Sequence, residues 1–105
     1  MKEIRLADWE ISAIRTAFSE SFPDTDHLWL FGSRIYPEKR GGDIDLYIET
    51  TMQDVDDIGK SESKFLFMVE DAIGEQKIDI VIKCVNSDFD LLIYHVARKE
   101  GVQLV

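Results

Sequence analysis

The stretch Asp43-Ile44-Asp45-Leu46-Tyr47-Ile48-Glu49 decides the fold class, because aliphatic residues occupy every second position. Successive side chains of a strand point to opposite faces, so this stretch predicts a strand with one apolar and one acidic face. Residues 77–83 alternate in the same way and place Asp79 on the face opposite their isoleucines. We therefore expect Asp43, Asp45 and Asp79 to lie on the same face of one small sheet.

Three helices are predicted from apolar residues at helical spacing. The first covers residues 8–22 with Asp8 as its N-cap, and the second is a core helix over residues 61–73. A third is expected over residues 88–99, capped by Asp88. Its expected inward residues are Phe89, Leu92, Ile93 and Val96. The aromatic residues interpreted as packing rather than base-stacking residues are Trp9, Trp29, Phe65, Phe67 and Phe89.

Two further strands complete the expected sheet. Residues 27–31 are a short apolar run that ends at Gly32, and residues 102–105 predict a short edge strand. The order of helices and strands indicates an α/β (α+β) domain with a small mixed sheet. We expect helices on one face of this sheet, and we expect the acidic face to stay open. Residues 1–105 contain no linker or repeat, so they are expected to form a single domain.

The composition limits the partners of the chain. Its 12 Lys and Arg residues against 21 Asp and Glu residues give a net charge of −9, which repels nucleic-acid backbones, so no stable DNA binding is expected. Cys84 is the single cysteine, which favours a reducing compartment such as the cytoplasm. No apolar run has the length of a membrane span, and the first residues lack an apolar signal core. We therefore expect neither membrane insertion nor export.

The residues suited to ligand binding or catalysis lie on the acidic strand or close to it. Gly32-Ser33 at the end of a strand allows close approach of the backbone to a phosphate. Asp43, Asp45 and Asp79 supply three carboxylates, the hard oxygen ligands that Mg²⁺ prefers, and two such ions can clamp both the attacking and the leaving oxygen in phosphoryl transfer. The intervening loop adds basic side chains that suit a leaving polyphosphate. They are Arg34, Lys39 and Arg40.

At these residues the sequence resembles the minimal nucleotidyltransferases of the DNA polymerase β-like superfamily. Their pattern is Gly-Ser, a loop, Asp-x-Asp-Leu and a distant Asp on a later strand, and it extends over nearly the whole chain. The resemblance implies a polymerase β palm-like fold in which Gly32, Ser33 and Arg34 bind the nucleotide. It further implies that Asp43, Asp45 and Asp79 form the catalytic, metal-binding set, with Mg²⁺ as cofactor and ATP as substrate. Gly42 departs from this pattern, because many relatives carry a serine there.

Small members of this family resemble antitoxins that are paired with a helical HEPN-type ribonuclease toxin. The resemblance implies transfer of AMP from ATP to a tyrosine hydroxyl of that toxin, and a homo- or hetero-oligomer is compatible with it. One alternative is a non-catalytic antitoxin, a binding module that masks the toxin sterically. Another is nucleotidyl transfer to a small molecule or to RNA, although the negative charge makes RNA the less attractive acceptor.

Other polar residues have structural interpretations. His27 and His95 lack the spacing of a nucleophilic or metal site, so they receive no catalytic role. Cys84 ends a predicted strand and is interpreted as an inert small apolar residue. Three further acids lack the ligand spacing of a calcium loop and are interpreted as a solvated loop. They are Asp54, Asp56 and Asp57.

Overall fold

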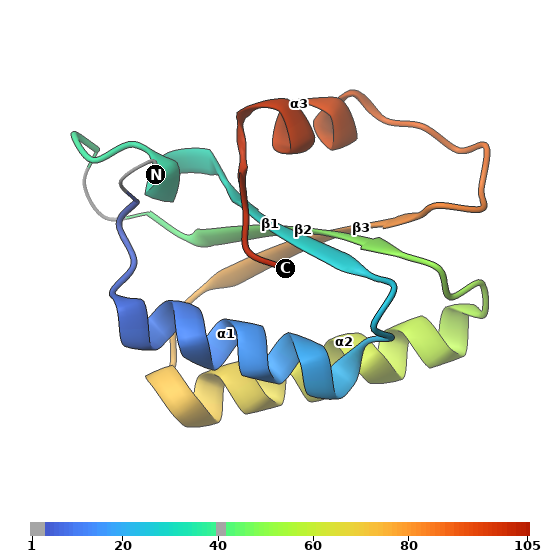
Figure 1. Ribbon diagram of the computed structural model, residues 1–105, viewed down its shortest axis with the longest axis horizontal. Helices are drawn as coiled ribbons and strands as arrows, with labels where there is room; N and C mark the ends of the chain where they lie inside the picture. Colours follow the sequence, from blue (N-terminus) through green and yellow to red (C-terminus); the bar gives the residue numbers. More distant parts are fainter. Residues whose placement is uncertain (1–3, 40–41) are drawn as a thin grey trace.

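A computed structural model describes residues 4–39 and 42–105 of the chain (Figure 1). Helices and strands alternate along it. In chain order they are α1 (Asp8–Ser21), β1 (His27–Phe31), the 3₁₀ helix η1 (Gly32–Ile35), β2 (Ile44–Thr50), α2 (Val55–Ile73), β3 (Ile78–Cys84), α3 (Leu92–Glu100) and β4 (Val102–Gln103). Each predicted strand is therefore present, and the two alternating strands start and end within one residue of their predicted bounds.

The four strands form one mixed sheet in the order β3-β2-β1-β4. The strand β1 pairs antiparallel with both β2 and β4, whereas β2 and β3 are parallel neighbours. Parallel neighbours need a crossover connection, and α2 supplies it between β2 and β3. This arrangement confirms the α/β (α+β) class and the mixed sheet.

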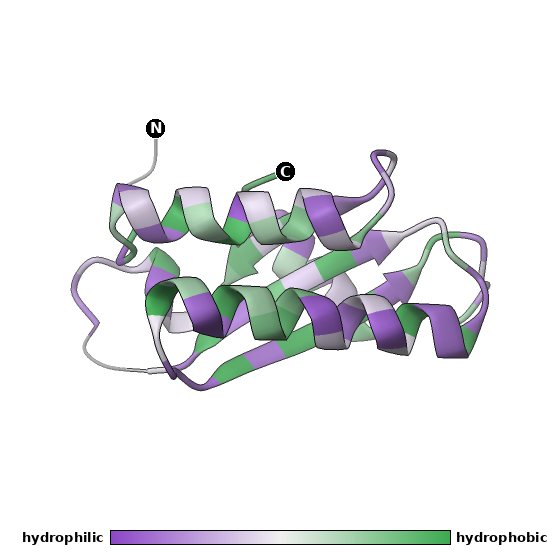
Figure 2. Cartoon of the chain, turned by 90° about the horizontal axis from the view of Figure 1, so that it is seen from below, coloured by the Kyte–Doolittle hydropathy of each residue, from purple (hydrophilic) through white to green (hydrophobic). Residues whose placement is uncertain are grey.

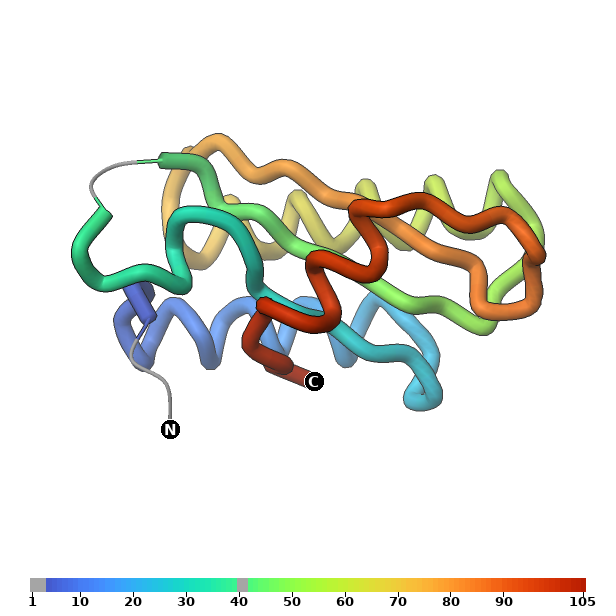
Figure 3. Tube along the Cα trace, turned by 90° about the horizontal axis from the view of Figure 1, so that it is seen from above, coloured from blue at the N-terminus to red at the C-terminus, as the bar shows by residue number. Residues whose placement is uncertain are grey.

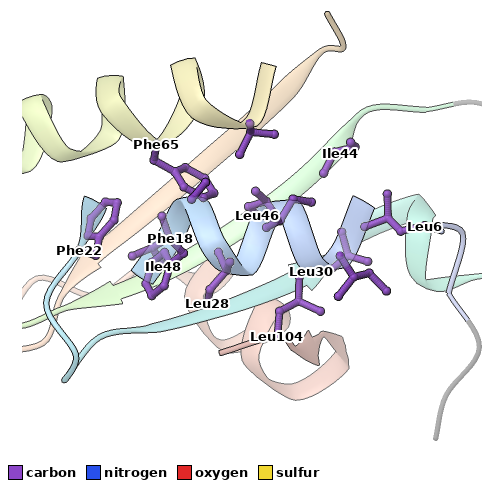
Figure 4. Packing of buried hydrophobic residues seen from close by; sticks show 14 of the residues in the cluster. Leu6, Phe18, Phe22, Leu28, Leu30, Ile44, Leu46, Ile48, Phe65 and Leu104 are labelled. Atoms are coloured by element: carbon purple, nitrogen blue, oxygen red, sulfur yellow. The ribbon is translucent and has the colours of Figure 1, made fainter. Parts of the chain in front are cut away.

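The main core lies between the sheet and the helix pair α1 and α2, which lie side by side below it (Figures 1 and 2). Leu46 and Ile48 of β2 are fully buried on this face. Phe18 of α1 and Phe65 of α2 belong to the same core and meet edge to face, with ring centroids 6.0 Å apart (Figure 4). Every second residue of β2 is apolar because this face is removed from water.

The opposite face of the sheet is partly covered by α3, so the prediction that it stays open is wrong. Tyr94 and Ala97 of α3 are buried in a second cluster with Trp29 of β1 and Tyr47 of β2. The rings of Tyr47 and Tyr94 are stacked, with centroids 5.8 Å apart. Figure 3 shows α3 crossing the middle of the sheet, away from the end at which β2 and β3 begin. The acidic end of this face therefore remains uncovered by α3.

The orientation of α3 also differs from the prediction. The residues predicted to face inward are exposed, and Leu92 is 79% exposed. Aromatic packing of Tyr94 on Tyr47 and the small size of Ala97 determine the buried side instead. Asp88 does not cap the helix, because α3 begins at Leu92 and Leu91 occupies the cap position without a side-chain hydrogen bond. The misplaced inward residues are Phe89, Leu92, Ile93 and Val96.

Two predictions on the helical side are also wrong. The helix α2 begins six residues before the predicted start at Ser61, and Asp54 is its N-cap, accepting hydrogen bonds from the amides of Asp56 and Asp57. These acids stabilise a helix N-terminus rather than form a loop. The aromatic residues Trp9 and Phe67 are largely exposed. Trp29 and Phe65 are buried as predicted.

The first helix differs only at its cap. Asp8 is its first helical residue, and Ala7 takes the cap position, where its amide donates to the Glu10 carboxylate at 2.9 Å. Within the described ranges no helix has the length and apolarity needed to cross a membrane.

Candidate functional site

The predicted site residues meet at the end of the sheet where β2 and β3 begin and β1 ends. The parallel register places Asp45 directly beside Asp79, and the antiparallel register places Asp45 beside Phe31, the last residue of β1. Gly32 follows Phe31 and opens η1. Asp43 lies immediately before β2. Strand pairing therefore brings the Gly-Ser pair and all three carboxylates together from separate parts of the sequence.

Gly32 lies against the carboxylate of Asp45. Its φ of +76° is in the left-handed region, which favours glycine. A Cβ at this position would overlap the Asp45 carboxylate and stand 3.1 Å from its Cγ. Two independent constraints therefore require glycine here, one from the backbone and one from the acidic side chain.

Gly42 makes a second close approach, to the hydroxyl group of Ser33. Its φ is +87°, and a Cβ there would overlap Ser33 Oγ. A serine at this position would therefore displace the Ser33 side chain. Glycine at position 42 thus has a local steric reason in this chain.

Burial and neighbouring negative charges change the acidity of Asp45. Burial, followed by the negative charges of Asp79 and Asp43, raises the pKa of Asp45, whereas Lys77 partly opposes the change. Among the described residues, Asp45 and Asp79 have no hydrogen-bonding or ion-pair partner. The site is thus a pair of neighbouring carboxylates whose charge is only partly compensated by the protein.

Lys77 is the cation of this site. Its Nζ lies 3.3 Å from Asp43 Oδ2, and hydrogen bonding to Asp43 is the main reason that the pKa of Lys77 is raised. No role for Lys77 was predicted from the sequence. Its position two residues before Asp79 could have indicated one, because side chains two residues apart lie on the same face of an extended chain, here where it enters β3.

The three carboxylates fit a magnesium ion by ligand type. They offer hard oxygen ligands on adjacent strands, and their mutual repulsion would be relieved by a divalent cation. In the described part of the chain, no three His, Cys, Asp or Glu side chains already form a metal-binding group. Asp43, Asp45 and Asp79 would therefore have to turn toward a common point to share an ion.

Arg34 holds the loop that follows η1. Its Nη1 donates to the carbonyl oxygen of Arg5 at 2.8 Å, and its Nη2 donates to that of Gly42 at 3.4 Å. The Arg5 side chain donates in turn to the carbonyl oxygens of Ser33 and Tyr36. The arginine pair thereby fixes the backbone around Gly42. A nucleotide-binding role for Arg34 stays a prediction.

The remaining predicted residues lie at the margin of the site or away from it. Lys39 lies over the ring of Tyr36, 5.7 Å from its centroid, whereas Arg40 is outside the described residues. His95, which was assigned no catalytic role, bonds to Asp90 at 2.7 Å.

The comparisons with known proteins add no identification. The sequence matches no family model, and no curated protein matches it significantly.

Proposed function

We propose that the chain is a Mg²⁺-dependent nucleotidyltransferase that transfers AMP from ATP to a hydroxyl group. The observation that carries the proposal is the contact of Gly32 with Asp45, which itself lies beside Asp79. It joins the Gly-Ser pair to the carboxylate pair at one end of the sheet. A phosphate bound along the Gly32 backbone would lie next to the groups that bind its metal ion.

The protein's own residues have distinct parts in this reaction. Gly32, which lacks a side chain, lets the triphosphate approach the backbone, and the Ser33 hydroxyl is available as a hydrogen-bond donor. Asp43 and Asp45 hold the metal, and Asp79 either completes this set or takes the proton of the acceptor hydroxyl. Magnesium, when bound, neutralises phosphate charge as it develops in the transition state.

The reaction is a substitution at the α-phosphorus of ATP. The acceptor oxygen forms a bond to this phosphorus, the bond to the bridging oxygen of the β-phosphate breaks, and pyrophosphate leaves with the electron pair. The acceptor proton passes to Asp79 or to water. Lys77, which pairs with Asp43 at the edge of the site, is placed to attract the anionic substrate.

The proposed acceptor is a tyrosine of a HEPN-type ribonuclease toxin, and the modification makes this chain the antitoxin in the cytoplasm. The resemblance to small antitoxin members supports this choice. The net charge of −9 favours a protein acceptor over RNA. The acidic end of the sheet is not covered by α3, which leaves room for a macromolecular acceptor (Figure 3).

Transfer is tested by incubating the purified chain with α-labelled ATP, Mg²⁺ and the protein encoded next to it. We expect labelled AMP on a tyrosine of that partner, found by peptide mass. The double variant Asp43→Asn/Asp45→Asn should lower labelling by about 10²-fold or more, because it removes the metal ligands.

The matched control is Asp56→Asn/Asp57→Asn, which makes the same charge change in the exposed first turn of α2. This control should label the partner as the wild type does. Equal labelling by the wild type and the Asp43/Asp45 variant would contradict the proposal, as would equal loss in the control.

A steric antitoxin is the second candidate, and the exposed side of α3 favours it. Leu92 is 79% exposed, and Ile93 and Val96 are also exposed, which gives α3 an apolar outer side; Phe89, 61% exposed, lies in the segment before the helix. Apolar side chains grouped on a surface are typical of protein interfaces. If the Asp43→Asn/Asp45→Asn variant still neutralises the ribonuclease without labelling it, masking accounts for the antitoxin activity.

A further inference from the structure

A second pocket lies on the α3 side of the sheet, away from the carboxylates. Its volume is about 240 Å³, and the later parts of β2 and β3 form it together with α3. Its polar lining comprises Glu49, Lys83, His95, Arg98 and Lys99, over the rings of Tyr47 and Tyr94. Glu49 follows Asp45 by four residues on the same face of β2, a separation of roughly 13 Å along a strand. Tyr47, which belongs to the aromatic cluster under α3, lies between Asp45 and Glu49 on the strand.

The pocket is cationic in a chain of net charge −9. Its lining includes three basic side chains, Lys83, Arg98 and Lys99, and one carboxylate, that of Glu49, while Asp90, outside the lining, pairs with Lys83. Glu49 is 8% exposed and already satisfied. One of its oxygens accepts a bond from the Tyr47 hydroxyl at 2.7 Å, and both lie 3.1 Å from Arg98 Nη1. Its charge is therefore compensated within the protein.

Glu49 and Trp29 both contact the Arg98 guanidinium and orient it. The group lies 5.2 Å from the centroid of the Trp29 ring, and only its Nη1 donates to Glu49. Among the described residues, Nε and Nη2 of Arg98 have no hydrogen-bond acceptor. A guanidinium that is oriented in advance and retains free donors is well suited to bind an anion.

The two lysines add unused donors around the same space. The Nζ of Lys83 lies over the Tyr94 ring and 3.7 Å from Asp90 Oδ1, beyond hydrogen-bonding distance. Asp90 is instead bonded to His95 at 2.7 Å. In the described part of the chain, Lys99 has no ion-pair or hydrogen-bond partner. The side chain of Lys83 is only 26% exposed, and its ammonium group has an ion pair with Asp90 but no hydrogen-bond acceptor among the described residues, so its donors stay available.

We propose that this pocket is a binding site for a phosphate group, either free or carried by a small molecule, and that it needs no metal ion. The planar donors of Arg98 would bind two phosphate oxygens, while Lys83 and Lys99 would neutralise the remaining charge. The volume of about 240 Å³ is below the range of drug-sized ligand pockets, which favours a small ligand.

The test is a titration followed by ¹H–¹⁵N NMR in EDTA, which excludes metal-dependent binding at the carboxylates. The probes are inorganic phosphate, pyrophosphate and glycerol 1-phosphate. We expect saturable shifts of the Arg98 Nε–H signal and of the amides of α3. Tighter binding of glycerol 1-phosphate would identify a phosphorylated small molecule as the source, and tighter binding of an inorganic probe would identify a free anion.

Charge variants localise the binding. Lys83→Gln and Lys99→Gln should each weaken binding about tenfold, which corresponds to the loss of one charge-assisted hydrogen bond. The matched control Lys60→Gln removes an exposed lysine of α2, on the opposite side of the sheet, and should leave the affinity unchanged. Absence of saturable binding to the wild type would overturn the proposal. Equal weakening in the control, or shifts centred on Lys77, would overturn it too.

Discussion

Replacing Gly32 by alanine tests the contact that carries the proposed function. At φ +76° an alanine costs about 1–2 kcal/mol in backbone strain. Its Cβ would overlap the Asp45 carboxylate, and turning this carboxylate off its rotamer costs a further ~0.5–1.5 kcal/mol. The sum, about 1.5–3.5 kcal/mol, corresponds to a fall in Tm of roughly 10 °C for a domain of this size.

The same substitution should reduce AMP transfer more than it reduces stability. The Asp45 carboxylate has to move by about 1 Å to reach normal contact with the new methyl group, and a displacement of this size can cost on the order of 10²-fold in rate. Thermal unfolding followed by circular dichroism measures the first effect. The labelling reaction, run well below the Tm of the variant, measures the second.

Gly74→Ala is the matched control for backbone strain. Gly74 has a φ of +89°, but a Cβ there would meet no atom within 4 Å. This variant should lose stability and keep its transfer activity.

A double-mutant cycle then isolates the contact. In an Asp45→Ala background, the cost of Gly32→Ala should fall by about 0.5–1.5 kcal/mol, because the overlapping carboxylate is gone. An equal cost in both backgrounds would refute the reasoning, and so would a Gly32→Ala protein with the Tm of the wild type.

Three further substitutions test the charge at the site and two tightly packed positions elsewhere in the fold. Asp45→Asn should stabilise the fold at pH 7 by on the order of 0.5 kcal/mol, because it removes a like charge. Because the pKa of Asp45 in the wild type is raised, this gain should shrink as the pH falls from 7 toward 4. Urea unfolding of both proteins at pH 7 and pH 4 measures the change. Asp26→Ala should cost about 3 kcal/mol in urea unfolding, since it leaves the buried hydroxyl of Thr50 without its acceptor. Gly101→Ala should cost about 2–3 kcal/mol by the same assay, because its Cβ would stand 2.9 Å from the carbonyl oxygen of Leu30.

The strands were predictable because burial acts on every second residue. Ile44, Leu46 and Ile48 are fully buried against the helices, so the alternation in the sequence reports the face of the sheet directly. The start of α2 was not predictable from apolar spacing, since Val55 is 80% exposed and the first turns bury little. Only the capping acid Asp54 marks that start, through its side-chain bonds to two amides.

The orientation of α3 illustrates a different limit. Apolar spacing identifies a helix stripe, but it does not say which side meets the sheet. Tyr94 is buried because Tyr47 and Trp29 present an aromatic surface, and that surface exists only once β1 and β2 are paired. Sequence spacing alone therefore predicted the more aliphatic side of the helix, which includes Leu92, as the buried one.

That the candidate residues share one face of the sheet was predictable from spacing, but their contacts were not. Spacing placed Asp45 and Asp79 on outward faces of two strands. Their direct pairing depends on the parallel register, which a crossover of 19 helical residues sets. The role of Lys77 beside Asp43 follows from the same register. The end of β1 before Gly32 was predicted, but the fit of Gly32 against a carboxylate depends on the antiparallel register that pairs Phe31 with Asp45, which no local pattern predicts.

Several features that oppose folding coincide at this one end of the sheet. Like charges are neighbours at Asp45 and Asp79, burial and repulsion raise the pKa of Asp45, and Gly32 and Gly42 adopt left-handed backbone conformations. Packing alone would favour pairing each acid with a cation, as at Glu49 on the same strand. Local conflicts of this kind are expected where function, rather than stability, selects the residues. Of two carboxylates on one strand, Glu49 is fully paired, whereas Asp45 has no partner among the described residues, and this contrast supports the proposed catalytic role of Asp45 independently of the sequence resemblance.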